Sequence, residues 1–357
     1  MIAIILGTRP EIIKMSPIIR LLSKRQEDYF VVHSGQHYSY EMDKIFFEEL
    51  ELPLPEFNLD VGSGTHGEQT AKILTGTERI LTQKKPDTVL VQGDTNTVLA
   101  GALAAAKLDI NVGHVEAGLR SYDRKMPEEV NRVLTDHMSE YLFAPTQEAK
   151  KNAVLEGIAT DKIYVTGNTI VDSVEQNLKI AEDNRNILDE LCLKQECYFL
   201  VTAHRQENVD DKFRLGNLLE ALEALHEKYS IPIIFPMHPR TKKRIREYQL
   251  EVSNGITTIQ PMGFLEFLLL EANARLVLTD SGGVQEETCI LRVPCVTLRE
   301  NTERPETLEV GSNTLAGVTP KEIMQAVETM LERETNWTNP FGNGYAAQKI
   351  IDNIHSR

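Results

Sequence analysis

Short apolar runs alternate with amphipathic segments of helical period along almost the whole chain, and this alternation limits the possible folds more than any other feature. The helical segments of the first half include residues 10–23, 67–83 and 97–107. The predicted strands between them are residues 2–6, 29–33, 88–91, 111–115, 141–144 and 163–166. Strands that alternate with helices at this spacing predict a parallel sheet with helices on both faces. Pro17 breaks the pattern, because it falls inside the first helix and should kink or interrupt it.

The pattern then begins again with a second set of predicted strands, at residues 198–202, 231–236, 257–259, 276–279 and 295–298. Between the two sets lies a charged segment with helical character, residues 171–194, without a long Pro, Gly or Ser linker. A chain of 357 residues also exceeds the usual size of a single hydrophobic core. The sequence therefore predicts an α/β protein of two doubly wound, Rossmann-like domains joined near residues 167–172, with a ligand between them.

The composition narrows the classes of function. The chain has 38 Lys and Arg residues against 53 Asp and Glu, a net charge of −15, which argues against a nucleic-acid partner. Its four cysteines lack C-x-x-C spacing, so we expect reduced thiols. The apolar residues 2–6 lack the basic start of a signal peptide and are too short to span a bilayer. We expect a soluble, cytoplasmic protein without a membrane partner.

The sequence T-D-S-G-G-V-Q-E-E at residues 279–287 follows a predicted strand and leads into a helical segment. A strand, a turn of small residues and a helix together point free backbone N–H groups at an anion. Ser281, Gly282 and Gly283 would let a phosphate approach the main chain, although ordinary strand-to-helix turns also carry S-G-G. Glu286 and Glu287 add carboxylates that suit the paired hydroxyls of a ribose. The segment therefore favours a nucleoside diphosphate site.

Three carboxylates in the first half of the chain lie at the end of a predicted strand or at the start of a predicted helix. Asp94 follows one predicted strand, Glu116 follows the next, and Glu128 comes after Pro127 at a helix start. Asp94 could instead cap the helix near residue 97, and Glu128 could form an exposed i, i+4 ion pair with Arg132. If the three face one crevice, they supply the base, the acid and the pKa-biasing group that proton abstraction from carbon requires.

Cationic and imidazole side chains also stand at predicted strand ends. Arg9 and Lys14 could bind a phosphate or carboxylate, although Arg9 could equally be a surface arginine at a turn. His204 and His238 each lie in a basic cluster after a strand, which suits an anionic ligand, and Arg304 lies in a charged loop that could line a cleft. No H-x-x-x-H, H-E-x-x-H or G-x-G-x-x-G spacing is present, so we predict neither a metal nor a nicotinamide cofactor.

Taken together, these motifs resemble the non-hydrolysing UDP-N-acetylglucosamine 2-epimerases nearly from end to end. The matching segments are G-T-R-P-E at residues 7–11, Q-G-D-T at 92–95, H-V-E-A-G-L-R at 114–120, P-E-E at 127–129, V-T-G-N-T at 165–169, D-S-G-G at 280–283, T-E-R-P-E at 302–306 and N-P-F-G-N-G at 339–344. Each motif is weak alone, but the ordered set is highly specific.

The resemblance implies a GT-B glycosyltransferase-like architecture with the ligand in the interdomain cleft. The first domain would comprise residues 1–168 and carry the carboxylate cluster, and the second would comprise residues 169–343 and bind UDP. A C-terminal helix, residues 344–357, would cross back onto the first domain.

The resemblance also implies the reaction. It is the interconversion of UDP-GlcNAc and UDP-ManNAc at C2 in the cytoplasm, usually by a homodimer, to supply ManNAc units for surface polysaccharides. UDP leaves by anti elimination through 2-acetamidoglucal and then adds back, so no cofactor is required. Carried over by motif, the sugar-side and catalytic groups are Lys14, Asp94, Glu116, Glu128 and His204. The corresponding UDP contacts are Arg9, His204, Ser281, Gly282, Gly283, Glu287 and Arg304.

Members of this family also bind a second UDP-GlcNAc as an allosteric activator. The matching segment here includes Gln36 and His37, and His238 is a further candidate allosteric residue. Bacterial relatives often carry Arg where this chain has Tyr38.

Other activities fit part of the pattern. A hydrolysing 2-epimerase, which releases UDP and free ManNAc, shares the fold and most motifs, and a 2-epimerase of a UDP-2,3-diacetamido sugar acid is closer still. A GT-B glycosyltransferase would use the same UDP pocket but needs no cluster of three carboxylates. A non-catalytic nucleotide-sugar sensor would bind the ligand without turnover.

Overall fold

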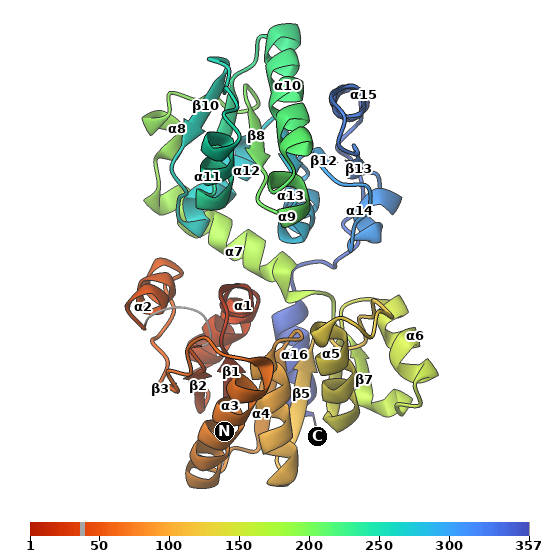
Figure 1. Cartoon of the computed structure of the whole chain (residues 1–357). Helices are drawn as coiled ribbons and strands as arrows, with labels where there is room; N and C mark the ends of the chain where they lie inside the picture. The colour runs from red at the N-terminus through yellow and green to blue at the C-terminus, as the bar shows by residue number, and fades with distance from the viewer. Residues whose placement is uncertain (36–39, 357) are drawn as a thin grey trace. The chain divides into compact units, whose positions relative to one another are not determined.

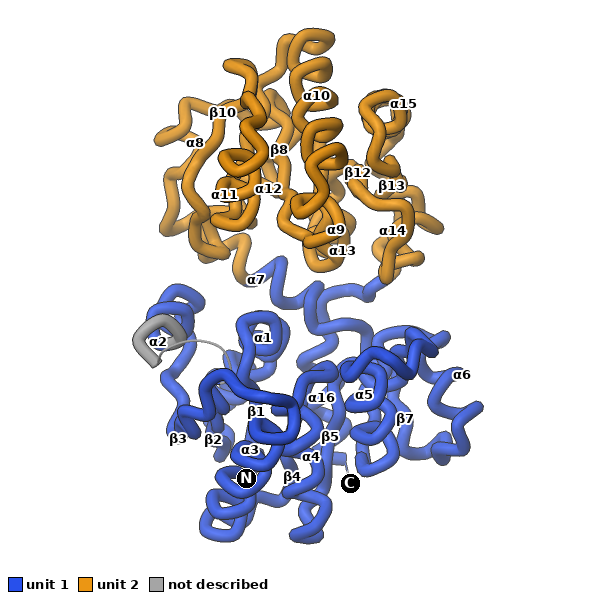
Figure 2. Tube along the Cα trace, viewed as in Figure 1, with its two compact units in different colours: residues 1–176, 341–357 blue, residues 177–340 orange. Residues whose placement is uncertain are grey.

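The computed structural model describes residues 1–35 and 40–356, which divide into two compact units (Figures 1 and 2). Unit 1 contains Met1–Gln176 and Phe341–Arg357, and unit 2 contains Asn177–Pro340. The division falls within helix α7 (Thr169–Asn184), a few residues beyond the boundary expected from the sequence. Within unit 1, helix α16 (Ala346–His355) packs against α1 (Arg9–Arg25). The Asp172 carboxylate fixes the start of α16 by accepting hydrogen bonds from two of its backbone N–H groups, at 3.1 and 3.0 Å.

Among the described residues, unit 1 contains a seven-stranded sheet of order β3-β2-β1-β4-β5-β6-β7, with every neighbouring pair parallel. Its strands are β1 (Ile2–Leu6), β2 (Tyr29–His33), β3 (Phe57–Asn58), β4 (Thr88–Gln92), β5 (Asn111–Val115), β6 (Tyr141–Ala144) and β7 (Ile163–Val165). Its remaining helices are α2 (Tyr40–Glu49), α3 (His66–Lys84), α4 (Asn96–Lys107), α5 (Pro127–Met138) and α6 (Gln147–Leu155). The predicted strands are confirmed, whereas β3 was missed because two residues show no periodicity.

Unit 2 contains a six-stranded parallel sheet of order β10-β9-β8-β11-β12-β13. Its strands are β8 (Phe199–Thr202), β9 (Ile233–Pro236), β10 (Ile256–Ile259), β11 (Leu276–Thr279), β12 (Cys295–Thr297) and β13 (Asn313–Leu315). Its helices include α8 (Ile187–Glu190), α9 (Gln206–Val209), α10 (Lys212–Tyr229), α11 (Pro239–Glu247), α12 (Phe264–Asn273), α13 (Gly282–Leu291), α14 (Pro305–Glu309) and α15 (Pro320–Leu331). The predicted pair of doubly wound α/β sheets is therefore confirmed (Figure 1).

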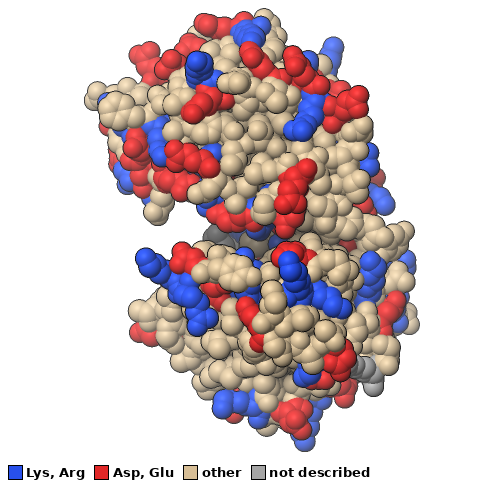
Figure 3. Space-filling model, turned by 90° about the vertical axis from the view of Figure 1, so that its right-hand side faces the viewer, with Lys and Arg blue, Asp and Glu red and all other residues tan. Residues whose placement is uncertain are grey.

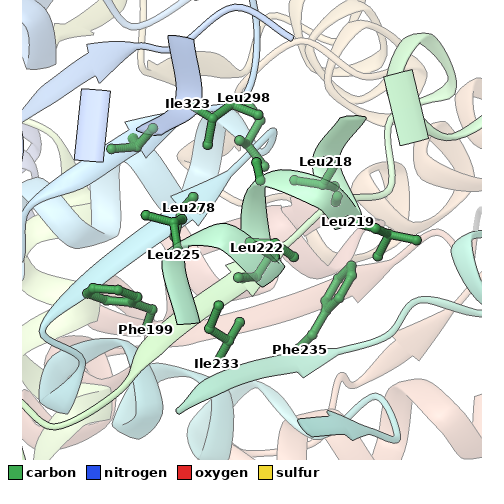
Figure 4. Close-up of a cluster of buried hydrophobic side chains, with 14 of the residues drawn as sticks. Phe199, Leu218, Leu219, Leu222, Leu225, Ile233, Phe235, Leu278, Leu298 and Ile323 are labelled. Atoms are coloured by element: carbon green, nitrogen blue, oxygen red, sulfur yellow. The ribbon is translucent and has the colours of Figure 1, made fainter. Parts of the chain in front are cut away.

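The apolar face of α10 covers one side of the unit 2 sheet. Leu222 and Leu225 of this helix are fully buried in a cluster with Phe199, Ile233 and Leu278 from three neighbouring strands (Figure 4). Truncation of such a leucine to alanine costs about 2–5 kcal/mol, because the lost contacts leave a cavity. This packing fixes the strands whose carboxyl ends carry the polar motifs of the second half.

Helix α1 continues through Pro17, so the predicted interruption is wrong. Proline cannot donate to the carbonyl four residues earlier, which here belongs to Ile13. Two hydroxyl groups replace the missing donor, because Ser16 and Ser173 donate to the Ile13 oxygen at 2.8 and 2.9 Å. The helix therefore tolerates Pro17 without leaving a buried carbonyl unsatisfied.

Each sheet reverses its strand order at one point, and ligands of doubly wound proteins bind at the carboxyl ends of the strands beside such a point. In unit 1 the reversal lies between β1 and β4, which neighbour each other although β2 and β3 come between them in sequence. In unit 2 it lies between β8 and β11. The loops after these four strands begin at Gly7, Gly93, Ala203 and Asp280, so they carry the motifs singled out from the sequence.

The surface mixes both signs of charge. On the face drawn in Figure 3, basic side chains occur in small groups among acidic ones, in keeping with a net charge of −15. Of the helices described, none combines the length and apolar character that crossing a membrane requires.

Candidate active site

Glu116 is the centre of a polar network at the carboxyl end of the unit 1 sheet. Lys14 Nζ from α1 and Asn168 Nδ2 from the start of α7 both lie within hydrogen-bond reach of Oε1, at 2.6 and 2.7 Å. Gln92 at the end of β4 donates to the other oxygen, Oε2. Three donors from three elements compensate for the burial of the carboxylate, which is only 9% exposed.

The backbone of Glu116 is also unusual. Its φ is 68°, in the left-handed region that non-glycine residues with long side chains seldom occupy. Strain of this kind persists where the surroundings impose it, and it is concentrated at functional sites. Here the hydrogen bonds to its carboxylate hold the residue in place.

Asp94 lies on the loop after β4, near Glu116 and Glu128, whose charges act on it. Burial raises the pKa of the Asp94 carboxyl; the charge of Arg132 opposes this rise, and the charges of Glu116 and Glu128 add to it. Arg132 on α5 donates a hydrogen bond to Asp94 Oδ2, and Asn131 holds the backbone carbonyl of Asp94 at 2.9 Å. The alternative in which Asp94 caps the next helix is wrong, because the capping residue of α4 is Thr95.

Glu128 lies in the first turn of α5 with an exposed side chain. The alternative i, i+4 ion pair with Arg132 does not occur in the described part of the chain, since Arg132 contacts Asp94 and Glu129 instead. Glu129 is buried, and it accepts hydrogen bonds from the backbone N–H groups of Ser121 and Tyr122. Of the neighbouring residues Glu128 and Glu129, Glu128 is therefore the accessible one. Its negative charge contributes to raising the pKa of Asp94.

The loop after β1 is held by Glu11, which the sequence did not single out. Its Oε2 accepts from the backbone N–H groups of Gly7 and Thr8 at 2.6 and 3.0 Å, and its Oε1 accepts from Thr95 Oγ1 at 2.5 Å. Glu11 thus joins the loop before α1 to the loop that carries Asp94. Its complete burial raises the pKa of the carboxyl to about 7. Arg9, at the start of the same helix, lies over the ring of Phe46 with its Cζ 5.4 Å from the centroid.

In unit 2, a buried aspartate supports His204. Asp280, after β11, accepts hydrogen bonds from the backbone N–H groups of His204 and Arg205, both at 2.9 Å, and lies 3.2 Å from His204 Nδ1. Burial opposes ionisation of Asp280, but its hydrogen bond to His204 and the histidine's charge hold the carboxyl pKa below its usual value. The second ring nitrogen of His204, Nε2, is then the one left to meet a ligand.

His204 borders a cavity of about 230 Å³ at the carboxyl ends of β8, β9 and β11. Its ring centroid is 5.8 Å from that of His238, which also lines the cavity and caps α11 by accepting from Arg240 N–H at 3.2 Å. Burial, together with the nearby charges of His204 and Arg240, lowers the pKa of His238. The other lining residues are Thr202, Ala203, Pro236, Pro261, Met262, Phe267, Ser281 and Val284. Apolar walls with a few polar groups suit a flat heterocyclic ring.

The S-G-G turn opens helix α13, with Ser281 at the capping position. Neither glycine has a positive φ, so the backbone conformation does not require glycine at either position. A Cβ built at Gly282 would meet its nearest neighbour, Glu303 Oε2, at 3.9 Å, so internal packing does not require glycine either. Room therefore remains beside the backbone of Gly282 at the helix N-terminus, as an anion site needs.

The two carboxylates after this turn have different surroundings. Glu286 forms an ion pair with Arg304, whose Nε lies 2.6 Å from Oε1, and so positions the guanidinium at the start of α14. Glu287 is 8% exposed, and the carboxyl of Glu271 lies within hydrogen-bond reach of it.

The structure thus gathers the predicted residues into two groups, one in each unit. Lys14, Asp94 and Glu116 lie close together in unit 1, and His204, His238 and Ser281 line one cavity in unit 2. Gln36 and His37 lie outside the described residues. In residues 1–35 and 40–356, no group of three or more His, Cys, Asp or Glu side chains could hold a metal ion.

Sequence reasoning missed several supporting residues, namely Glu11, Gln92, Asn168, Asp280 and Glu271. The first four lie inside the polar motifs at strand ends, so their position was a signal that could have been used. Glu271 lies in an apolar helix, where a carboxylate directly after three leucines was the only sign.

The chain is similar to proteins of one family along nearly its whole length. A family model described as UDP-N-acetylglucosamine 2-epimerase matches residues 20–355. The chain is 60% identical to the UDP-N-acetylglucosamine 2-epimerase of Methanocaldococcus jannaschii, over 98% of this chain and 97% of the relative. It is 39% identical to the UDP-2,3-diacetamido-2,3-dideoxy-D-glucuronate 2-epimerase of Pseudomonas aeruginosa, over 98% and 97% of the two chains.

Among solved structures, the chain matches the M. jannaschii UDP-GlcNAc 2-epimerase in complex with UDP-GlcNAc and UDP. The TM-score is 0.86 at 59% sequence identity, and the match covers 100% of this chain and 99% of that one. The family model, the sequence identity over nearly the full length and the shared fold lead to one assignment: this chain belongs to the UDP-N-acetylglucosamine 2-epimerase family.

Proposed function

We propose that this chain catalyses the reversible epimerisation of UDP-GlcNAc to UDP-ManNAc at C2, by elimination and re-addition of UDP. The observation that carries the proposal is the pair of neighbouring carboxyls Asp94 and Glu116. Glu116 meets the ammonium group of Lys14 and two amide donors, whereas burial and the charge of Glu116 favour the protonated form of Asp94. One group ready to accept a proton and one ready to give it suit inversion at a carbon centre.

In the elimination step, the base takes the C2 proton while the C1–O electrons leave with UDP. A C1=C2 double bond forms, and the intermediate is 2-acetamidoglucal. In the return step, the acid protonates C2 on the opposite face and the phosphate oxygen bonds to C1 again. Glu116 and Asp94 fill these roles and exchange them in the reverse direction, with Glu128 as a third carboxylate that raises the proton affinity of Asp94.

We assign the nucleotide to unit 2. The uracil ring would occupy the cavity beside His204 and His238, and the diphosphate would meet the open N-terminus of α13 at Ser281, Gly282 and Gly283. Positive side chains stabilise UDP as a leaving group and hold it for return. In unit 2, we assign this role to His204 and Arg304.

We assign the proton chemistry to unit 1, and we expect the active protein to be a cytoplasmic homodimer that supplies ManNAc units for surface polysaccharides. A UDP-2,3-diacetamido sugar acid is a second candidate substrate, because the chain shares 39% identity with the P. aeruginosa enzyme named for that substrate.

Product analysis tests the reaction directly. Purified protein is incubated with UDP-GlcNAc, and the products are separated by anion-exchange chromatography and identified by NMR. We expect a stable mixture of UDP-GlcNAc and UDP-ManNAc. Stoichiometric free ManNAc and UDP would instead identify a hydrolysing enzyme. A parallel incubation with the diacetamido sugar acid nucleotide decides the substrate, because the true substrate should give the larger kcat/KM.

A further inference from the structure

Glu271 is a carboxyl group in the interior of unit 2 that the proposed mechanism does not use. It lies on α12, its exposed area is zero, and both of its oxygens are buried. Within the described part of the chain, no N–H or hydroxyl donor reaches either oxygen. Asp280, which is equally buried, accepts two backbone hydrogen bonds at 2.9 Å. A carboxylate buried without such donors would cost several kcal/mol, about as much as removing one partner of a buried ion pair.

The group that faces Glu271 is a second carboxyl. Helices α12 and α13 pack against each other, and Glu287 of α13 lies within hydrogen-bond reach of Glu271. The charge of Glu271 also acts on the Cys295 thiol on β12 and on the phenol of Tyr198, and neither of these groups brings a positive charge. The Tyr198 hydroxyl donates to the Leu270 carbonyl at 2.6 Å, so its proton is already used.

Two carboxyls in hydrogen-bond contact cannot both be charged without strong repulsion, and a single shared proton removes that repulsion. The proton belongs on the more deeply buried partner. Glu271 is fully buried, whereas Glu287 retains 8% of its exposure. Burial and the charge of Glu287 raise the pKa of Glu271 well above its usual value.

We propose that Glu271 is a positioning residue, which stays protonated and donates its O–H to Glu287, so that the Glu287 carboxylate is held toward the ribose hydroxyls of the nucleotide. This role rests on the proposed function, because it requires the nucleotide to bind at the start of α13. The pair carries one negative charge in total. Removal of the shared proton at alkaline pH would add a second charge and displace Glu287.

The test compares two substitutions of the same residue in the full-length protein. Glu271→Gln keeps a donor toward Glu287 and cannot titrate, so its affinity for UDP should stay within about twofold of wild type at pH 7. Glu271→Leu has similar volume and no donor, so its affinity should fall about tenfold, the equivalent of one hydrogen bond to a charged group. Isothermal titration calorimetry with UDP measures both, and Glu251→Gln, at an exposed position of the same unit, is the control.

A nucleotide without ribose hydroxyls separates positioning from packing. With 2′,3′-dideoxy-UDP, the difference between Glu271→Leu and wild type should disappear. The alkaline fall in UDP affinity expected of wild type should be absent from Glu271→Gln. Equal losses in the Gln and Leu variants, or the same loss with the dideoxy nucleotide, would mean that Glu271 only fills space and would overturn the proposal.

Infrared spectroscopy detects the proton without any nucleotide. The carbonyl band of the protonated Glu271 carboxyl should appear in the difference spectrum of wild type minus Glu271→Gln at pH 8, in which the bands of the other carboxyls cancel. If that band is present but UDP does not bind to wild type, the proposed function and the positioning role both fail, while the shared proton stands. If the band is missing although UDP binds, the proposed function survives and the inference about Glu271 is wrong.

Discussion

Units 1 and 2 have the same doubly wound architecture but use carboxylates in opposite ways at their strand ends. In unit 1, Asp94 and Glu116 are the groups toward which positive and amide side chains point. In unit 2, Asp280 and Glu286 lie behind His204 and Arg304 and position them. The same α/β framework can therefore serve two kinds of chemistry. Where the carboxylates are the outermost groups at a strand end, they can transfer protons. Where they lie behind cationic side chains, they position those side chains for an anion.

The largest effect should come from the unit 1 carboxylates. Asp94→Asn or Glu116→Gln should lower kcat by about 10²-fold or more, because an amide cannot accept or deliver the C2 proton. Gln at position 116 keeps an acceptor for Lys14, so the fold should survive. Steady-state kinetics measure the loss, with Glu148→Gln as a surface control. Near-normal kcat in either amide variant would show that the outermost carboxylates of unit 1 are not the acid and base.

The next test disturbs anion binding in unit 2. Gly282→Val should lower UDP affinity by about 10²-fold, because the branched side chain occupies the space that the phosphates need. The nearest protein atom is 3.9 Å from the added Cβ, so circular dichroism should show an unchanged fold. Gly216→Ala, in the second turn of α10, is the matched glycine substitution and should bind UDP normally. Unaltered binding by the valine variant would place the phosphates elsewhere.

Glu11 is an exception to this pattern, because it is a carboxylate of unit 1 that holds two loops in place. Its titration can be tested through the pH dependence of stability. Its folded pKa of about 7 exceeds the 4.5 of an exposed glutamate, so between these values the folded protein holds a proton that the unfolded chain has lost. The resulting stabilisation is complete below about pH 4.5 and disappears as the pH rises through about 7. At 1.4 kcal/mol per pKa unit, the free energy of unfolding should fall by roughly 3 kcal/mol across this window.

Glu11→Gln removes this pH dependence and keeps the three contacts. The amide oxygen can accept from Gly7 and Thr8, and the amide nitrogen can donate to Thr95. Urea denaturation between pH 4.5 and 7 should show a flatter profile for the variant, whereas the exposed Glu78→Gln should follow wild type. Parallel profiles for wild type and Glu11→Gln would mean that Glu11 is ionised throughout.

The smallest effect expected is on retention of the intermediate. His204→Ala should weaken UDP binding about tenfold, because one charge-assisted contact is lost. Turnover should slow, and the proportion of free UDP and 2-acetamidoglucal among the products should rise, as NMR of the reaction mixture would show. An unchanged product ratio would indicate that His204 supports the cavity without holding UDP.

The fold was predictable because both sheets consist of short apolar strands bounded by helices with clear periodicity. The strands β3 and β13, of two and three residues, were too short to show it. The strand ends carried the candidate site, since parallel strands bring their carboxyl ends to one edge. The partners within each site could not be predicted. Whether Asp94 or Thr95 caps α4 depends on local geometry, because both residue types cap helices well.

Contacts between residues far apart in the sequence were still harder to predict. Glu116 meets Lys14 from 102 positions away and Asn168 from 52 positions away, and strand order decides both contacts. Glu271 and Glu287 meet only because α12 packs against α13. A carboxyl in an apolar helix reveals its role only when the group that faces it is known.

The most direct test of the division between proton chemistry in unit 1 and nucleotide binding in unit 2 is proton NMR of the reaction in D2O. With wild-type protein, deuterium should appear at C2 of both UDP-GlcNAc and UDP-ManNAc. Asp94→Asn and Glu116→Gln should bind UDP with unchanged affinity but lose deuterium incorporation. Epimerisation with retention of the original C2 hydrogen would contradict proton transfer by these carboxylates and would require a hydride route.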